Sequence, residues 1–268
     1  RDLRMSRGLG DVYKRQLLTE SKSLGQVVIS AVAAAAHVII LVFSKDLGSA
    51  VIFFAGYLIM VFIATKNYFY LFAGILGGAG ASIVAYHMFS HVRTRVIAFL
   101  HPWSNINDSG YQITQSLFAI GTGGWFGLGI DQGDPTSIPY VEQDFVFSAV
   151  AEEMGVIFGI CLILVCVSCF IVFMKIAMQL KEDFYRYIAV GISTIYIFQV
   201  FLTIGGGTRF IPLTGVTLPL VSYGGSSVLT TIIMFGIIQG LYCIQSQEGK
   251  RNVRKERRRT ADREAGEE

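Results

Sequence analysis

Residues 145–174 read FVFSAVAEEMGVIFGICLILVCVSCFIVFM, and this stretch decides the class of fold. Only Glu152 and Glu153 are charged in it. A run of about 20 mostly apolar residues is long enough to cross a hydrocarbon core roughly 30 Å thick. Because the backbone finds no water inside a bilayer, such a run must form a helix that satisfies its own hydrogen bonds. The stretch therefore predicts a membrane-spanning helix.

Further apolar stretches of similar length lie on both sides of this one, at residues 27–43, 47–65, 68–89, 187–204 and 220–244. The chain of 268 residues is 53% hydrophobic and 15% charged, with a mean hydropathy of +0.55. About a quarter of the residues of a soluble domain are charged. We therefore expect an all-α, polytopic membrane helix bundle with six spans and one large loop, residues 90–144, outside the membrane.

The polar ends of the chain differ from this apolar middle. Residues 1–16 begin with Arg1 instead of Met and are interpreted as a non-native leader on a fragment, so they are left out of the fold. Residues 17–248 form the membrane domain, and residues 249–268 form a basic tail. The net charge of +3 does not indicate nucleic-acid binding, since the basic residues gather in this tail.

Lysine and arginine positions predict the orientation of the spans. If the basic tail is cytoplasmic, the alternation of spans puts Lys14, Lys22, Lys66, Lys175, Lys181 and Arg186 on the cytoplasmic side as well. This agrees with the excess of positive charge found in cytoplasmic loops. The same alternation places residues 90–144 and the turn at residues 205–219 outside the cytoplasm.

A glycine-rich stretch within the large loop reads QSLFAIGTGGWFGLGI at residues 115–130. It is too apolar for a flexible linker, and its glycines disfavour a straight span. We interpret it as a partly inserted or surface-lying element that packs against the bundle, where irregular backbone is tolerated.

Charged and polar residues on the predicted outer side form the candidate binding site. Lys45 and Asp46 lie between two spans, where Asp46 either caps the following helix or contacts substrate. Arg95 belongs to a second group, since guanidinium groups bind phosphate through paired hydrogen bonds. The same loop contributes Gln112 and Gln115 as further candidates, and anchoring of the loop is the alternative role for this group.

Asp144 is the candidate that we single out for chemistry. It lies where the outer loop meets a long apolar helix, and Glu152 follows about two turns deeper and about 80° around that helix. A lone aspartate there would be read as a helix cap. Two further acidic residues inside the apolar run favour a functional role, because ionisable groups within membranes usually serve function.

A proline- and glycine-rich segment at residues 205–227 supplies the last group of candidates, Arg209, Ser222 and Tyr223. It predicts a rigid, non-helical opening with exposed backbone donors, of the kind that broken helices form at transporter binding sites. His87 and His91 have the i, i+4 spacing of a helical metal pair, but no third ligand is evident, so we predict no protein-held metal. The four cysteines form no CxxC pair and are interpreted as packing residues.

Four segments, in order, resemble the signature segments of the SEDS family (shape, elongation, division and sporulation). They are KDLGSA (45–50), GYQITQSLFAIGTGGWFGLGI (110–130), PYVEQDFVFSAVAEEMG (139–155) and IPLTGVTLPLVSYGGSS (211–227). Members of that family have ten spans, so the resemblance implies that this chain lacks the first three or four.

The resemblance implies a peptidoglycan glycosyltransferase that polymerises lipid II at the outer face of the bacterial cytoplasmic membrane. It also implies a class B penicillin-binding protein as partner, besides the membrane lipids. The essential acid of the family corresponds to Asp144, which would act as general base on the attacking sugar hydroxyl. Lys45, Arg95, Arg209 or a divalent cation, Mg²⁺ or Mn²⁺, would stabilise the departing pyrophosphate.

Two rival functions remain open at this point. A flippase for lipid-linked precursors would place charged residues along a path through the membrane, whereas the ionisable groups here cluster at one end of the spans. A non-catalytic scaffold for a penicillin-binding protein would tolerate the loss of Asp144.

Overall fold

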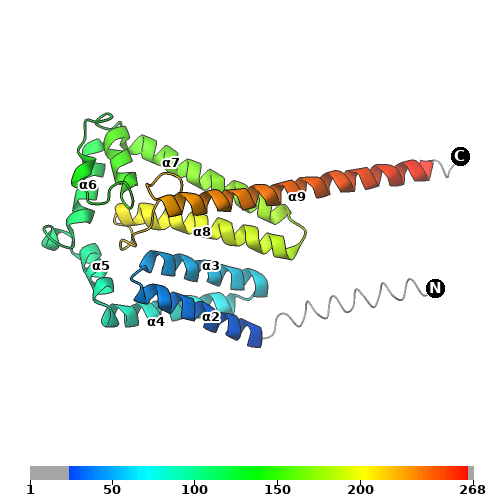
Figure 1. Cartoon of the computed structure of the whole chain (residues 1–268), viewed down its shortest axis with the longest axis horizontal. Coiled ribbons are helices and arrows are strands. Elements are labelled where there is room, and N and C mark those ends of the chain that lie inside the picture. The colour runs from blue at the N-terminus through cyan, green and yellow to red at the C-terminus, as the bar shows by residue number, and fades with distance from the viewer. Residues whose placement is uncertain (1–23, 265–268) are drawn as a thin grey trace. The chain divides into compact units, whose positions relative to one another are not determined.

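The computed structural model describes residues 24–264, and the predicted leader at residues 1–16 lies outside them together with Lys14 and Lys22. Within this range the chain forms helices and contains no strand, which confirms the all-α class. The helices, labelled in Figure 1, are α2 (Leu24–Phe43), α3 (Leu47–Thr65), α4 (Tyr68–Met88), α5 (Ser90–Leu100), α6 (Tyr111–Gly123), α7 (Val146–Gln179), α8 (Asp183–Gly207) and α9 (Gly225–Glu264). Two short 3₁₀ turns, η1 (Trp103–Asn105) and η2 (Pro135–Ser137), lie in the large loop.

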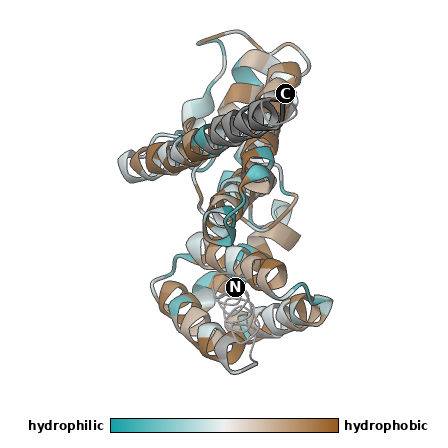
Figure 2. Ribbon diagram, turned by 90° about the vertical axis from the view of Figure 1, so that its right-hand side faces the viewer, coloured by the Kyte–Doolittle hydropathy of each residue, from teal (hydrophilic) through white to brown (hydrophobic). Residues whose placement is uncertain are grey.

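Five helices in the described range are long and apolar enough to cross a membrane. They are α3, α4, α7, α8 and the part of α9 from Gly225 to Gln247. The remaining predicted span corresponds to the shorter apolar stretch Val27–Phe43 of α2. Each predicted span therefore falls largely on a helix of the described range, and five of these helices have the length and apolarity that a bilayer demands. Figure 2 shows apolar residues distributed along the helices.

The first of two compact units ends at Ala85 and contains α2, α3 and most of α4. Helices α2 and α3 pack side by side, and the hydroxyls of Ser30 and Tyr57 are hydrogen-bonded between them (3.0 Å). The tight turn between them places Lys45 in the left-handed region (φ 63°), which lets the chain reverse within three residues.

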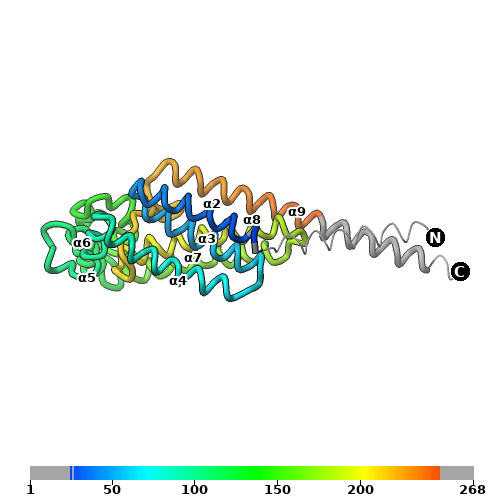
Figure 3. Tube along the Cα trace, turned by 90° about the horizontal axis from the view of Figure 1, so that it is seen from below, coloured from blue at the N-terminus to red at the C-terminus, as the bar shows by residue number. Residues whose placement is uncertain are grey.

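The second unit, from Tyr86 onward, contains the rest of the chain. In it α7 packs against α8 and α6, and α9 lies along both α7 and α8, as Figures 1 and 3 show. Half of the most apolar part of α8 is buried. Small and hydroxylated residues, among them Ser193, Thr194 and Thr203, make this close packing possible.

Helix α7 departs from the single straight span that the sequence predicts. Gly155 has a non-helical backbone (φ 84°, ψ 168°), and the helix breaks there. Figure 1 shows its short first part turned away from the long second part. Hydropathy does not reveal this break, because the residues on both sides of Gly155 are mostly apolar.

The non-helical segment 124–130, which we call the strap, bridges the break in α7. The N–H groups of Leu128 and Gly129 donate to the carbonyls of Glu152 and Glu153 (both 2.9 Å). Beyond the break, Val156 donates to the Gly124 carbonyl (3.0 Å). The strap thus satisfies backbone groups that the broken helix leaves free.

Glycine is required where the strap crosses α7. A Cβ atom at Gly127 would lie 2.2 Å from the Glu153 carbonyl oxygen, and one at Gly155 would lie 2.4 Å from the Gly127 nitrogen. Both residues also have positive φ angles, which side chains disfavour. The glycine-rich composition that the sequence shows therefore serves close backbone approach.

Helix α9 begins at Gly225, five residues later than the predicted span at 220–244. Leu220 has a left-handed backbone (φ 62°), and Thr217 and Ser227 are hydrogen-bonded through their hydroxyls (2.7 Å). Residues 211–224 therefore stay outside the helix, as a non-helical segment that reaches the candidate site. We call it the proline segment.

Candidate active site

Asp144 lies at the end of a tight turn directly before α7. The N–H groups of Gln143 and Asp144 donate to the Tyr140 carbonyl (3.0 and 3.2 Å), and Tyr140 has a left-handed backbone (φ 59°). Phe145 is fully buried against Ala119 and Ile138, which fixes the turn to the protein core. A large apolar anchor next to the acid thus holds the half-buried Asp144 in one place.

The proline segment is tied to the turn that holds Asp144. Ser222 Oγ donates to the Gln143 carbonyl (2.5 Å) and accepts from the Leu218 N–H (2.8 Å). The Tyr223 N–H donates to the Glu142 carbonyl (2.7 Å). Because these bonds reach the residues on the N-terminal side of Asp144, the proline segment and the acid form one rigid assembly.

The other side of the proline segment is fixed to α8. Thr203 Oγ1 donates to the Val216 carbonyl (2.8 Å), and Gln199 Nε2 donates to the Thr217 carbonyl (3.0 Å). The segment is therefore supported by side chains of a buried helix, although it has no regular structure of its own.

Arg95 on α5 faces the same part of the proline segment as Asp144. Its Nη1 donates to the Leu213 carbonyl (3.0 Å). Gly215 has a positive φ of 75°. A Cβ atom there would lie 3.6 Å from Nη1 and from Nη2 of Arg95, and 3.6 Å from Asp144 Oδ2. The Asp144 carboxylate and the Arg95 guanidinium group thus flank Gly215. Within the described residues they form no direct ion pair.

The surroundings of Asp144 affect its ionisation. Burial raises the pKa of the Asp144 carboxyl above its ordinary value, and the positive charge of Arg95 lowers the pKa without cancelling this effect. Burial acts this way because a charged carboxylate loses hydration inside the protein. An aspartate with a raised pKa is a stronger base than an aspartate in water, which suits proton abstraction.

Arg209 serves a different purpose from Arg95. Its Nε donates to the Phe99 carbonyl (3.0 Å) and its Nη2 to the Leu100 carbonyl (3.3 Å), at the C-terminal end of α5. A cation there satisfies carbonyls that the helix leaves free. Arg209 is thus engaged in holding the helix that presents Arg95.

The remaining candidates of the second unit differ in exposure. Ser222 is buried and occupied by its two backbone bonds, whereas the Tyr223 side chain is exposed. Gln112 and Gln115 are half-buried on α6. Tyr223 and the two glutamines therefore present polar side chains that the described hydrogen bonds do not occupy.

Glu152 lies under the loop before η2. It is buried, its Oε1 accepts from the Asp134 N–H (3.3 Å), and its Oε2 has no hydrogen-bond partner in the described part of the chain. Glu153, which the sequence did not single out for a role, accepts from the Asp131 N–H in the same way (3.3 Å). Both carboxylates thus fasten the loop that leads to Asp144.

A buried serine pair was also missed by the sequence interpretation. The hydroxyls of Ser116 on α6 and Ser148 on α7 are hydrogen-bonded (2.5 Å), and Ser116 Oγ donates to the Gly207 carbonyl at the end of α8 (2.8 Å). This network joins α6, α7 and the end of α8. Serine within otherwise apolar helix faces is the signal that could have indicated it.

Lys45 and Asp46 belong to the first unit and are described there alone. Asp46 is the N-cap of α3, and its Oδ1 accepts from the Ser49 N–H (3.0 Å). Lys45 is exposed. Of the two roles left open for Asp46, the geometry shows the capping bond.

Within the described residues, Asp144 offers a single carboxylate to a divalent ion. Mg²⁺ is usually held by one or two carboxylates together with substrate phosphates, so the protein alone supplies only part of a ligand set here. The described residues contain no group of three or more His, Cys, Asp or Glu side chains placed to hold a metal, and the pair His87 and His91 gains no third ligand among them.

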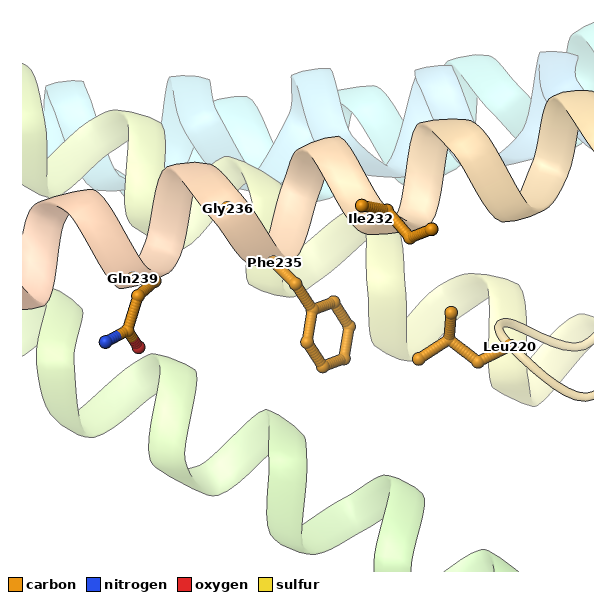
Figure 4. A pocket seen from close by; sticks show the side chains of 5 residues that line it. All are labelled: Leu220, Ile232, Phe235, Gly236 and Gln239. Carbon is orange, nitrogen blue, oxygen red and sulfur yellow. The ribbon is translucent and has the colours of Figure 1, made fainter.

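An apolar groove of about 410 Å³ begins beside the proline segment. Leu220 forms one end, and Ile232, Phe235, Gly236 and Gln239 of α9 line the rest, as Figure 4 shows. These four lie in the membrane-spanning part of α9, and Leu220 lies only two residues before Ser222. The groove therefore joins the proline segment, at Leu220, to the apolar flank of α9.

Fold and site together define a class of protein. It is a multi-pass helical membrane protein in which one carboxylate, one guanidinium group and a rigid non-helical segment meet at one end of the bundle. The model of the cell cycle protein family, which comprises FtsW, RodA and SpoVE, matches residues 8–247. The chain belongs to this family, also called SEDS.

Individual relatives agree with this assignment. The peptidoglycan glycosyltransferase RodA of Mycobacterium tuberculosis (strain H37Rv) is 38% identical over 200 residues, which cover 74% of this chain and 42% of that protein. The probable peptidoglycan glycosyltransferase FtsW of Francisella salina is 36% identical over 236 residues, covering 84% of this chain and 55% of that protein. The chain thus spans about half the length of these relatives.

A solved structure has the same fold. It comes from a study titled "Structural coordination of polymerization and crosslinking by a peptidoglycan synthase complex" and matches with a TM-score of 0.70 at 24% identity. The match covers 84% of this chain and 64% of that chain.

Proposed function

We propose that this chain is part of a peptidoglycan glycosyltransferase that polymerises lipid II. The observation that carries the proposal is the half-buried Asp144, whose pKa is raised by burial and which faces Arg95 across Gly215. The names of its relatives, RodA and FtsW peptidoglycan glycosyltransferases, support the same reaction.

The proposed reaction joins two lipid-linked sugars. Asp144 takes the proton of the attacking sugar hydroxyl, and the hydroxyl oxygen forms a bond to the anomeric carbon of the second molecule. The bond from that carbon to the pyrophosphate breaks, and its electron pair leaves with the lipid pyrophosphate. General-base catalysis of this kind contributes about 10²–10⁴-fold to the rate.

Arg95 stabilises the negative charge of the leaving pyrophosphate. One of its guanidinium nitrogens bonds the Leu213 carbonyl, which orients the group before substrate arrives. Preorganised positive charge stabilises developing negative charge without reorganisation. Arg209 supports this role indirectly through α5. Lys45 stays a proposed contact of the pyrophosphate, and so does a Mg²⁺ or Mn²⁺ ion, which the substrate phosphates would help to hold.

We place the reaction at the outer face of the cytoplasmic membrane. In the second unit, Asp144 precedes α7 while Lys175 and Lys181 lie at the other end of that helix. Helix α8 then returns the chain, and α9 leads away from the site to the basic residues of the tail. Positive charge marks the cytoplasmic side, so Asp144 lies on the opposite side.

The proposal also gives a binding place to the apolar tail of the lipid-linked substrate. The groove at Leu220 and α9 is apolar, opens within the spanning part of the helix, and begins two residues from Ser222. A polyprenyl chain placed there leaves its head group beside Asp144. A class B penicillin-binding protein, which would cross-link the product, is the proposed protein partner.

The deciding experiment measures glycan formation. The chain reconstituted in lipid vesicles is given purified lipid II, and the products are separated by gel electrophoresis. We expect a ladder of glycan strands from the parent and from Glu142→Gln, which changes an exposed carboxylate two residues away. Asp144→Asn is expected to abolish the ladder. An unchanged ladder from this variant would overturn the base assignment.

A further inference from the structure

The strap exposes large apolar side chains that no part of the described chain covers. Trp125, Phe126 and Ile130 are 68%, 85% and 73% exposed. Residues 124–130 contain no charged side chain, and the first charge after them is Asp131. A cluster of this kind marks a surface that contacts a membrane or a partner.

The position of the strap along α7 can be compared with the thickness of a bilayer. Residues 156–179, after the break, are about 36 Å long at 1.5 Å per residue. This length suffices to cross a hydrocarbon core of about 30 Å. The first part of α7 contains the polar residues Ser148, Glu152 and Glu153. The break at Gly155 therefore lies at the level where the spanning part ends and the polar region begins.

The strap continues the lipid-facing surface of α7. The Ile157 N–H donates to the Trp125 carbonyl (3.3 Å), so the strap adjoins the start of the spanning part. Ile157 and Phe158 at this start are also exposed. The exposed apolar side chains of the strap therefore adjoin those at the start of the spanning part of α7.

Several polar groups of the strap backbone are bonded within the protein, which favours contact with lipid. Leu128 and Gly129 donate to α7, Gly127 donates to the Gly123 carbonyl (2.8 Å), and the carbonyls of Gly124 and Trp125 accept from α7. Irregular backbone next to lipid is tolerated only where its polar groups are bonded internally. Tryptophan prefers the interface between hydrocarbon and head groups, where its ring is buried and its N–H meets water.

We propose that the strap is a membrane anchor, in which Trp125 and Phe126 insert into the lipid leaflet nearest Asp144. Its bonds to Glu152 and Glu153 then hold the first part of α7, and with it Asp144, at a fixed height above the hydrocarbon. This proposal does not depend on the reaction that Asp144 catalyses.

Tryptophan fluorescence tests the anchor directly, because the chain has two tryptophans, Trp103 and Trp125. Trp103→Phe leaves Trp125 as the only reporter, and Trp125→Phe leaves Trp103 in the polar loop. Both variants are reconstituted in phosphatidylcholine vesicles whose acyl chains are brominated near the head group, in the middle or near the end. Iodide in the buffer serves as the aqueous quencher.

We expect bromine near the head group to remove most of the Trp125 emission, deeper bromine to remove less, and iodide to have little effect. Trp103 should show the reverse, with quenching by iodide and little by bromine. Quenching of Trp125 by iodide alone would place it in water and overturn the proposal. Quenching by neither would place it under protein, whether another segment, a second copy or a partner, and would overturn it equally. If Trp103→Phe does not fold, the difference between the parent and Trp125→Phe reports the same quantity.

Discussion

Two aspartates in this chain stand directly before apolar helices, and they do different things. Asp46 is the N-cap of α3, and its carboxylate is exposed and accepts from the Ser49 N–H. Asp144 lies one residue before the N-cap of α7, Phe145, which forms no side-chain capping bond. No donor of the described residues occupies its carboxylate. The comparison teaches that a capping carboxylate is committed to its helix, whereas Asp144 is free to accept a proton from substrate.

The backbone causes this difference. The turn that starts at Tyr140 and the burial of Phe145 set Asp144 back from the helix by one position. The proline segment then covers the place beside it, with Gly215 at the closest point. Asp46 has no such cover within its own unit. Both aspartates precede an apolar run in the sequence, so this shared position does not decide the role, and the tertiary surroundings do.

The largest effect is expected from changing the two aspartates in the same way. Asp144→Asn keeps the size of the side chain but cannot take a proton, so we expect the rate of glycan formation to fall by about 10²–10⁴-fold. Asp46→Asn should leave this rate within about twofold, because an asparagine oxygen still caps a helix. Initial rates with lipid II measure both. Equal losses in the two variants would remove the distinction.

The same substitution has a predicted consequence for stability. The folded protein raises the pKa of Asp144 above its unfolded value, so the folded state holds the proton more tightly. The stability associated with this group is therefore present at low pH and is lost as the pH rises through the raised pKa. Asp144→Asn removes this loss, and we expect its Tm at neutral pH to be equal to or above that of the parent.

Arg95 is expected to affect how the rate of glycan formation depends on pH, because its charge acts on Asp144. Since the base must be unprotonated, activity should fall on the acid side at a pH above the ordinary range of an aspartate. The charge of Arg95 lowers the pKa of Asp144, so Arg95→Gln should move this acid limb to higher pH. It should also reduce kcat by on the order of 10²-fold, as for the loss of one preorganised donor.

Arg93 provides the matched control, because it lies on the same helix, is exposed, and contacts the Tyr86 ring and the His87 carbonyl. Arg93→Gln should leave the acid limb in place, and Arg95→Lys should shift it less than Arg95→Gln. A limb that does not move in Arg95→Gln would contradict the electrostatic coupling to Asp144.

The groove on α9 tests whether the free carboxylate of Asp144 serves a lipid-linked substrate. Gly236 lines the groove and Gly240 does not, and a Cβ atom at either meets nothing within 4 Å. Gly236→Leu should fill the groove and raise KM for lipid II about tenfold, equivalent to 1.4 kcal/mol. Gly240→Leu on the same helix should leave KM unchanged. Equal effects in both variants would show that the tail lies elsewhere.

Glu152 is a third carboxylate, and its geometry is more like that of Asp46 than that of Asp144. Its Oε1 accepts a backbone N–H, and a glutamine can do the same. We expect Glu152→Gln to keep most activity and Glu152→Leu to destabilise the loop by about 1 kcal/mol, the usual value of one hydrogen bond. Limited proteolysis between residues 124 and 138 would measure this loosening. A large loss of rate in Glu152→Gln with an intact loop would instead support contact with substrate.

The sequence predicted the spans and picked out Asp144 for different physical reasons. Hydropathy located the helices because a bilayer imposes length and apolarity on each one separately. Asp144 was identified as the candidate because it lies between a polar loop and an apolar run, and because of the family resemblance. The break at Gly155 was not predictable, since hydropathy averages over a single glycine and the strap that stabilises the break is defined only by tertiary hydrogen bonds.

Arg209 and Asp46 show the same limit at the level of single residues. Arg209 binds the end of a helix 110 positions away in the chain, which no local pattern indicates. For Asp46 the sequence allowed both a cap and a substrate contact, and only the bond to Ser49 distinguishes the two. A side chain's partners depend on the fold, whereas its tendency to lie at a helix start is local.

The smallest effect is expected where the comparison began, at the cap of α3. Asp46→Ala removes the bond to the Ser49 N–H, and loss of such a cap costs about 0.5–2 kcal/mol. Thermal unfolding in vesicles should therefore show a lower Tm for Asp46→Ala, while Asp46→Asn and Asp46→Ser, which keep an oxygen at the cap, should restore it. Glycan formation at a temperature well below Tm should be the same in all three. If all three variants, which lack the charge of Asp46, instead lost glycan formation equally, Asp46 would contact substrate. The two aspartates would then share one function.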